Sequence, residues 1–326
     1  MAELLGILDD RKYVWEKGEP RLVVPDVRES FRAGDGCVLE IADYSQIEVR
    51  LMAFMSQERS IIDALNAKKD IHCHMTSLVY GIAYALLDEV VVQKNKKHPR
   101  YNELSMKRSG VKTVTFGVPY GAGPKRIGEM IQEKDDSGCV IETMEHAIER
   151  AKELIENYFG AAPMLKAWLQ EMKFMAQTKG YTCSIEGRRR WYDLPSKDNP
   201  DYEQIMSQIG RFAGNHPIQS SSADMLKQAL RNLYLLNRGW DGGAAEPWTG
   251  KKVVDANVLL VAHDEIVTET AKKDAERQKA MLVKAMSDAY NSVQMVKIIN
   301  GVSKTIYLKD IYNKVDAITA PYWAKD

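Results

Sequence analysis

The chain has 326 residues, with 45 lysines and arginines against 45 aspartates and glutamates, so its formal net charge is zero. With 45% hydrophobic residues, this composition is typical of a folded globular protein and excludes a largely disordered chain. No apolar run approaches the roughly 20 residues of a membrane helix, and the N-terminus lacks the layout of a secretory signal. The lack of a long apolar run predicts no membrane partner. Four distant cysteines without a CxxC pair favour reduced thiols in the cytoplasm, with zinc or a disulfide as the alternative.

The first predicted element is a strand over residues 37–43, whose apolar side chains alternate and which ends at Asp43. A helix over 46–55 follows it. From about residue 70 to residue 202 the pattern is largely helical, with a 3.6-residue periodicity over the segments 70–80, 104–118, 124–134, 142–158 and 163–179.

A short two-stranded element over 181–195 interrupts the helices, and a long helix is predicted over about 202–236. Residues 237–252 are rich in Gly and Trp, which predicts a loop or hairpin. Residues 258–269 predict two strands joined by a tight turn, before a helix over 271–290 and a short C-terminal tail. Strand-and-helix segments at both ends therefore bracket a helical insertion, and we expect an α+β fold.

One basic segment stands out in the neutral chain. Nine lysines and arginines lie between Lys94 and Arg126, opposed only by Glu103. Such a segment suggests a surface that faces phosphates, balanced by an acidic site elsewhere. A solvated helical face is the alternative that charge alone leaves open.

Three carboxylates are predicted at the ends of core strands. Asp43 stands where a strand opens into a helix, and Asp264 and Glu265 lie at the turn between two strands. Carboxylates brought together from distant segments can hold magnesium ions, which keep waters and substrate phosphates as their other ligands. A single aspartate at such a position is more often a cap or turn residue.

Several motifs resemble those of family A (DNA polymerase I-like) DNA polymerases. The run DYSQIEVR (43–50) resembles motif A, and HDE (263–265) resembles motif C. Between them, residues 108–120 place Arg, Lys, Phe and Tyr at steps of four, which is the spacing of motif B. Three further segments resemble family segments in the family's order: DIH (70–72), GRRRWYDLP (187–195) and RFAGNHPIQSSSAD (211–224).

The resemblance implies a fold and a division of the chain. We expect a polymerase palm, an antiparallel sheet with helices, carrying a large helical fingers insertion, and no thumb or exonuclease domain. The expected domains are the N-terminal part of the palm over 1–55, the fingers over 56–204 and the C-terminal part of the palm over 205–326.

The resemblance also implies an enzyme, a DNA-directed DNA polymerase. It would transfer a deoxynucleoside monophosphate from a dNTP to a primer 3′-hydroxyl and release pyrophosphate. Two Mg²⁺ (or Mn²⁺) ions would be held by Asp43, Asp264 and the backbone carbonyl of Tyr44. Glu265 would support the primer terminus and the metal ligands, and Lys112 would act with them in catalysis.

The family's binding residues map onto two further groups in this chain. Seven residues would bind the incoming nucleotide: Gln46, Glu48, His72, Arg108, Lys112, Phe116 and Tyr120. Primer–template DNA would be contacted by Arg211, Asn215, Gln219 and His263. In the family, the glutamate and tyrosine at the positions of Glu48 and Tyr120 crowd the space of a ribose 2′-hydroxyl, so we expect a preference for deoxynucleotides.

Two departures from the family pattern matter. Pro119 sits immediately before Tyr120 and should kink or end the motif B helix, since proline lacks the backbone donor. Few residues precede the palm, which favours one subunit of a split polymerase, with thumb and 3′–5′ exonuclease on a second polypeptide; a fragment of a longer chain is the alternative. Residues 121–131 resemble phage members, which suggests the cytoplasm of a host cell.

Two other functions compete with an active polymerase. One is a catalytically weak DNA-binding subunit of a replication complex on a polymerase fold. The other is a two-metal nuclease that uses the same carboxylates, although motif B has no role in that chemistry.

Overall fold

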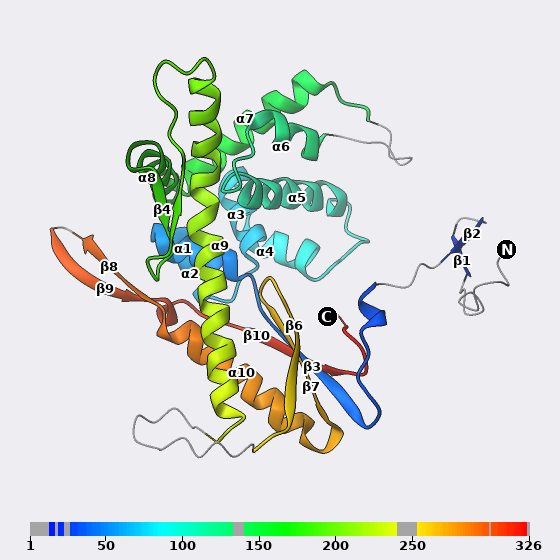
Figure 1. Cartoon of the computed structure of the whole chain (residues 1–326). Coiled ribbons are helices and arrows are strands. Elements are labelled where there is room, and N and C mark those ends of the chain that lie inside the picture. Colours follow the sequence, from blue (N-terminus) through cyan, green and yellow to red (C-terminus); the bar gives the residue numbers. More distant parts are fainter. Residues whose placement is uncertain are drawn as a thin grey trace, which may run out of the picture. The chain divides into compact units, whose positions relative to one another are not determined.

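The computed structural model describes residues 13–16, 19–22, 27–132, 140–239, 253–299 and 301–324 (Figure 1). Cys139 and most of the predicted loop over 237–252 lie outside these residues. The chain divides into two compact units, both built from discontinuous segments. We call them the sheet unit (1–43, 233–285 and 315–326) and the helical unit (44–232 and 286–314). The chain passes from one unit to the other at residues 43/44, 232/233, 285/286 and 314/315. The expected domain boundaries lie at 55/56 and 204/205 instead.

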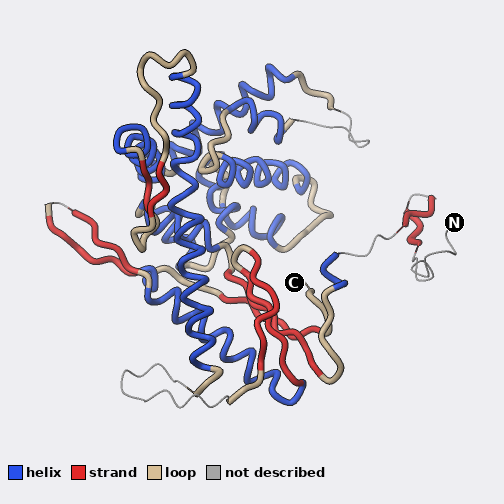
Figure 2. The backbone as a smooth tube through the Cα atoms, in the orientation of Figure 1, coloured by secondary structure: helices blue, strands red, loops and turns tan. Residues whose placement is uncertain are grey.

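The sheet unit is organised around four strands in the order β10–β3–β7–β6 (Figure 2). The strands are β3 (Cys37–Tyr44), β6 (Ala256–Ala262), β7 (Glu265–Ala271) and β10 (Val315–Ala320). β7 pairs antiparallel with both β3 and β6. Because side chains alternate along a strand, Leu39 and Ile41 face the same side as Val267 and form a buried core with Ala320.

The C-terminal segment differs from its prediction. It is not a short tail, because β8 (Gln294–Ile299), β9 (Val302–Tyr307) and β10 follow helix α10 (Ala275–Ser292). β10 lies beside β3, which is nearly three hundred residues earlier in the chain. Such a strand is stabilised by pairing with a distant partner, so a short stretch of sequence carries little sign of it.

The remaining short elements lie near the N-terminus and between larger elements. β1 (Tyr13–Glu16) and β2 (Glu19–Leu22) pair as a hairpin that the sequence did not predict. The other short helical turns are η1 (Val27–Ser30), η2 (Asp88–Val92), η3 (Lys272–Asp274) and η4 (Leu308–Asp310).

The helical unit confirms the predicted helical insertion. Its helices are α1 (Ile47–Ser56), α2 (Arg59–Asn66), α3 (Ile71–Tyr80), α4 (Tyr84–Leu87), α5 (Tyr101–Gly117), α6 (Pro124–Ile131), α7 (Met144–Ala161) and α8 (Pro163–Lys179). The hairpin of β4 (Tyr181–Cys183) and β5 (Arg189–Trp191) leads to α9 (Tyr202–Leu236), whose last residues belong to the sheet unit. No helix within the described ranges is long and apolar enough to cross a membrane.

A buried carboxylate fixes two helix ends in this unit. Glu58 is 3% exposed and precedes α2. Its Oε1 accepts hydrogen bonds from the amide and hydroxyl of Ser60, at 3.3 and 3.0 Å, while its Oε2 accepts from the amides of Met164 and Leu165, at 2.9 and 3.2 Å. Since the first amides of a helix have no partner within it, this carboxylate stabilises the starts of both α2 and α8.

Candidate active site

The strand register of the sheet unit brings the predicted carboxylates to one end of the sheet. Asp43 lies one residue before the end of β3 and is the direct partner of Glu265, the first residue of β7. Asp264 immediately precedes Glu265, in the turn between β6 and β7. Asp43 and Asp264 are both half-buried. Two segments more than two hundred residues apart therefore present their carboxylates together.

The side chain of Glu265 is already engaged by other residues. It is 8% exposed, and its Oε1 accepts a short hydrogen bond from the indole N–H of Trp323. Arg28 lies 3.5 Å from Oε2 and places its guanidinium 4.2 Å from the centroid of the Trp323 ring. This cluster holds Glu265 in place beside Asp264. Sequence reasoning missed Trp323 and Arg28, because no local pattern marks either one.

Strained backbone lies next to both carboxylate segments. His263, just before Asp264, has φ 54°, and Gln46, just before α1, has φ 55°. Both values lie in the left-handed region, which costs a residue other than glycine about 1–3 kcal/mol. Such conformations persist only where the surroundings hold them, and they are common at active sites.

Arg50 holds the turn that follows Asp43. This residue is 4% exposed, and its Nε donates to the carbonyl oxygen of Ser45 at 2.7 Å. Its guanidinium also donates a short hydrogen bond to the carbonyl of Tyr312, and the Ser45 amide donates to the Lys314 carbonyl at 3.0 Å. A buried guanidinium with this many contacts fixes the direction in which the chain leaves β3.

The chemistry of this end of the sheet fits magnesium. Asp43 and Asp264 supply carboxylate oxygens, and Tyr44, the last residue of β3, supplies a backbone carbonyl. Hard oxygen donors of this kind are the ligands that Mg²⁺ takes, usually one or two carboxylates with water and substrate phosphates. Within the described ranges no group of three or more His, Cys, Asp or Glu could hold a metal by itself. Water and substrate phosphates would complete the coordination of a metal held by these groups.

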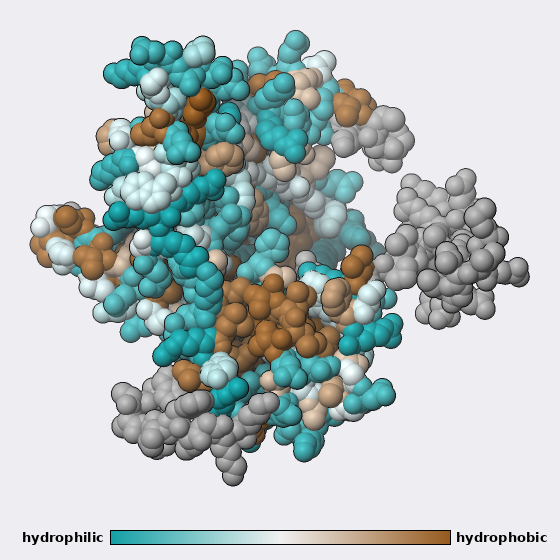
Figure 3. Space-filling model, in the orientation of Figure 1, coloured by the Kyte–Doolittle hydropathy of each residue, from teal (hydrophilic) through white to brown (hydrophobic). Residues whose placement is uncertain are grey.

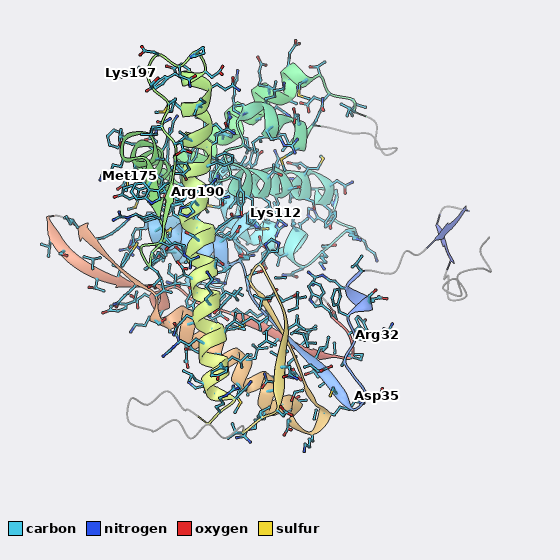
Figure 4. All side chains as sticks on the ribbon, viewed as in Figure 1. Arg32, Asp35, Lys112, Met175, Arg190 and Lys197 are labelled. Carbon is cyan, nitrogen blue, oxygen red and sulfur yellow. The ribbon has the colours of Figure 1, made fainter. Side chains whose placement is uncertain are left out.

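The predicted motif B residues lie on and just beyond α5. Arg108, Lys112 and Phe116 are one turn apart in the helix, and α5 ends at Gly117. Tyr120 lies in the turn that follows, as expected from the missing backbone donor of Pro119. Figure 4 shows Lys112 on this helix.

Arg108 is held by an ion pair that the sequence did not predict. Its Nε and terminal nitrogen donate to the two oxygens of Asp70, at 3.1 and 2.7 Å. Asp70 also caps α3, accepting from the Cys73 amide at 2.7 Å. Burial opposes ionisation of both groups, yet these bonds outweigh it, lowering the pKa of Asp70 and raising the pKa of Arg108. The pair ties α5 to the start of α3.

His72 lies buried and neutral beside this pair. It is 3% exposed, and its Nδ1 has no hydrogen-bond partner among the described residues. Its ring centroid lies 5.5 Å from that of Phe116. Burial lowers the pKa of His72 to about 4, and the nearby charges of Arg108 and Lys112 act in the same direction. A buried polar atom without a partner is uncommon in folded proteins and is often found at a functional site.

This low pKa predicts how stability changes with pH. Below pH 6.5 the unfolded chain binds a proton at His72 that the folded chain does not bind until about pH 4. Stability from this residue is therefore complete above pH 6.5 and is lost as the pH falls toward 4, by up to about 3 kcal/mol. Urea unfolding from pH 7 to pH 4 should show a smaller loss in His72→Gln. The exposed His146→Gln is the control, and equal losses in wild type and His72→Gln would refute the assignment.

A hydrogen-bond network joins three predicted site residues. The Tyr120 hydroxyl lies 2.6 and 2.7 Å from the two carboxylate oxygens of Glu48, and Gln219 Nε2 donates to that hydroxyl at 3.0 Å. Burial and the bond to Glu48 raise the pKa of Tyr120 to about 12, so the phenol stays protonated and acts as donor to Glu48. The network links α1, the turn after α5, and α9.

The turn after α5 also lies against α9. Gly121 has φ 80°, and a Cβ at this position would lie 2.5 Å from the Cβ of Arg211 and 2.9 Å from its backbone. Only glycine satisfies both conditions. On α9, Arg211 lies in this contact, and the Asn215 side-chain oxygen is buried with no hydrogen-bond partner among the described residues.

A cleft of about 1570 Å³ lies among α5, α6, α8 and α9. Its lining combines cations with aromatic rings: Lys112, Lys125, Arg126, Lys166, Lys173, Arg211, Phe116, Tyr120, Phe159 and Phe212. Lys112, Phe116, Tyr120 and Arg211 are therefore brought to one cavity, whereas His72 and Arg108 do not line it. Cations can hold phosphates and rings can stack on bases, so the cleft suits a nucleotide or a nucleic-acid strand.

Comparisons with known proteins agree on one family. Residues 23–305 match the model of DNA polymerase family A. The thermostable DNA polymerase I of Thermus filiformis is 30% identical over 265 residues, which are 81% of this chain and 26% of that protein. DNA polymerase I of Mycobacterium tuberculosis is 29% identical over 265 residues, covering 81% of this chain and 24% of that protein.

A solved structure is also similar. The POL domain of Pol1 from M. smegmatis, in complex with DNA primer-template and dNTP, matches with a TM-score of 0.65 and 25% identity. The match covers 94% of this chain and 46% of that one.

Proposed function

This chain belongs to DNA polymerase family A, and we propose on that basis that it is a DNA-directed DNA polymerase. It would transfer a deoxynucleoside monophosphate from a dNTP to the 3′-hydroxyl of a primer, directed by a template, and release pyrophosphate. The observation that carries this proposal is the β3–β7 register, which puts the carboxylates of motifs A and C at one end of the sheet.

The sheet unit would supply the catalytic carboxylates. Magnesium or manganese ions bound by Asp43, Asp264 and the Tyr44 carbonyl would acidify the primer hydroxyl and neutralise charge on the phosphates. Glu265 would act from its position between Trp323 and Arg28, keeping the turn and the primer terminus in place. Phosphoryl transfer needs little covalent chemistry from the protein, so these roles are mainly positioning and charge stabilisation.

The helical unit would bind the incoming nucleotide. Lys112 is exposed and lines the cleft, so it would contact the triphosphate directly. Arg108 would add positive charge from its pair with Asp70, and neutral His72 could donate one hydrogen bond to a phosphate oxygen. Phe116 would lie against the sugar, with Tyr120 near the templating base. Gln46 would also bind the incoming nucleotide, and its side chain is exposed.

Primer–template DNA would be contacted by residues of α9 and, separately, by His263. Arg211, Asn215 and Gln219 follow one another at helical spacing on α9, and His263 belongs to the turn before Asp264. Phosphate contacts by such residues set position and affinity rather than sequence preference. Primer extension by the purified chain with Mg²⁺ and four dNTPs tests this function. Binding of DNA without any incorporation would favour the alternative, a catalytically weak DNA-binding subunit.

Glu48 should set the preference for deoxynucleotides. Its carboxylate is held by the Tyr120 hydroxyl, and a ribose 2′-hydroxyl placed beside it would meet both side chains. Glu48→Ala should raise the ribonucleotide-to-deoxynucleotide ratio of kcat/KM by about 10-fold or more. Tyr120→Phe is the matched control, because it removes the hydrogen bond but keeps the ring. If the ratio is unchanged in Glu48→Ala, another group excludes the ribose.

A second polypeptide is also part of the proposal. The chain spans about a quarter of the length of the curated relatives it matches. We propose a partner polypeptide with thumb and 3′–5′ exonuclease functions, in a phage-like split polymerase that works in a host cytoplasm; the partner would add basic contacts to the duplex. A chain of zero net charge attracts DNA weakly, and duplex affinity depends largely on basic contacts to phosphates.

The partner proposal predicts how the purified chain behaves. Alone, it should bind primer–template weakly, with a shallow dependence of affinity on salt, and extend primers distributively. Adding a candidate thumb and exonuclease subunit should increase both affinity and product length. Binding and extension measured across a salt series, with and without that subunit, decide the matter. Tight, processive synthesis by the chain alone would contradict the split.

A further inference from the structure

The β4–β5 hairpin presents an unusual surface outside the residues discussed so far. Its inner side packs on α9, where Thr182 is fully buried and its hydroxyl lies 2.8 Å from Nδ1 of His216. All three residues of β5 are exposed. In the register, Tyr181 is the partner of Trp191, so these two rings lie on the same outward side of the hairpin.

Two aromatic rings and a guanidinium are grouped on that outward side. Trp191 is 64% exposed, and its ring centroid lies 5.0 Å from that of Tyr181. The guanidinium of Arg189 lies 4.7 Å from the Tyr181 ring and 5.8 Å from the Trp191 ring. A large ring left this open to water, with a cation beside it, is a surface able to receive another flat group.

The charge of the hairpin indicates the chemistry of its partner. Within the described ranges, neither Arg189 nor Arg190 has a carboxylate at ion-pair distance, whereas Arg188 pairs with Asp224. Two guanidiniums without acidic partners favour an anionic ligand. Exposed rings that alternate with guanidiniums are typical of surfaces that bind single-stranded nucleic acid, by stacking on bases and pairing with phosphates.

One residue of the hairpin contacts the lining of the cleft. Arg190 places its guanidinium 5.4 Å from the ring of Phe212, which lines the cleft together with Tyr120. Figure 4 labels Arg190 on this hairpin beside α9. Arg190 is the register partner of Thr182 and so lies on the side of the hairpin toward α9; a strand passing Phe212 would meet Arg190 before the outward residues Arg189 and Trp191.

We propose that the β4–β5 hairpin binds single-stranded DNA, with a base stacked on Trp191 and phosphates held by Arg189 and Arg190. The assignment of this strand as the unpaired template ahead of the primer terminus rests on the proposed polymerase function. The binding site itself does not, because it is built from residues outside the catalytic set.

The test compares DNA with and without an unpaired template. Fluorescence anisotropy would measure the affinity of the whole chain for primer–templates with a one-nucleotide overhang and with an overhang of about 10 nucleotides. The long overhang should increase the affinity of the wild-type chain. Trp191→Ala should lose about 10-fold on the long overhang, with little change on the short one, while Trp191→Phe should keep part of the gain.

Two further variants sharpen the result. Phe174→Ala removes a ring of nearly the same exposure, 63%, and should bind like the wild type. The double variant Arg189→Gln and Arg190→Gln should make the plot of log affinity against log salt shallower, by about 1 in slope, on the long overhang. Equal binding by Trp191→Ala and wild type, or an equal loss in Phe174→Ala, would overturn the proposal.

The outcome can be separated from that of the polymerase assignment. Asp264→Ala, which should lack incorporation, should keep the full gain from the long overhang. If the chain shows no incorporation but Trp191→Ala loses this gain, the hairpin site stands and the polymerase function fails. If incorporation is normal but Trp191→Ala binds like the wild type, only the hairpin site fails.

Discussion

Asp43→Ala and Asp264→Ala should each lower single-turnover incorporation by about 1000-fold or more. Both carboxylates lie at the end of the β3–β7 ladder, and Glu265 beside them is occupied by Trp323 and Arg28. Glu265 is therefore poorly placed to replace a missing carboxylate. The lost interaction acts mainly in the transition state, so affinity for primer–template should change little.

The control for this experiment is another carboxylate of the sheet unit. The side chain of Glu276 on α10 is 86% exposed and forms a surface ion pair with Lys279. Glu276→Gln should incorporate nucleotides at the wild-type rate. Thermal unfolding and DNA binding of the two aspartate variants should match the wild type. Near-normal single-turnover incorporation by either aspartate variant would remove that residue from the catalytic site.

Lys112→Gln should lower kcat/KM for dNTP incorporation by about 100-fold while leaving thermal stability unchanged. Lys112 is exposed and lines the cleft, so its charge is available to a triphosphate. Arg108 is different, because its guanidinium holds Asp70 in a half-buried pair. Arg108→Gln should therefore also lower stability, since it leaves the Asp70 carboxylate without its cation.

A lysine five residues earlier, on another face of α5, provides the matched control. Lys107 lies 3.8 Å from Glu103 and 4.5 Å from the ring of Tyr80, and it does not line the cleft. Lys107→Gln should keep normal kcat/KM, and Lys112→Arg should keep part of it because the charge remains. The measurement is pre-steady-state incorporation over a range of dNTP concentrations. Equal losses in Lys107→Gln and Lys112→Gln would indicate a general effect of charge.

Exposed apolar side chains occur both on the edge strand β6 and on the β4–β5 hairpin. On the edge strand β6, Val258, Leu259 and Val261 are 47%, 51% and 39% exposed, and Figure 3 shows an apolar patch on this face of the molecule. The β4–β5 hairpin differs because its rings are accompanied by guanidiniums, and this charge is what makes a ligand class assignable there.

Local sequence patterns determined the helices well. The helices over 163–179 and 202–236 were predicted with the bounds that the structure has, because apolar periodicity and the residues at helix ends are local properties. The α+β class and the family followed from the same local information. Motifs carry the chemical residues themselves, so the candidate carboxylates and the α5 cations could be named before the fold was known.

Tertiary structure alone decided which residues act together. The ion pair of Arg108 with Asp70, the engagement of Glu265 by Trp323, and the β10 strand all join positions far apart in the chain. No periodicity in one segment reports on such a partner, because the free energy of these contacts exists only once the segments meet. The fold likewise decides that Lys112 is exposed in the cleft while Arg108 is paired, and that the ring of Trp191 is open to solvent.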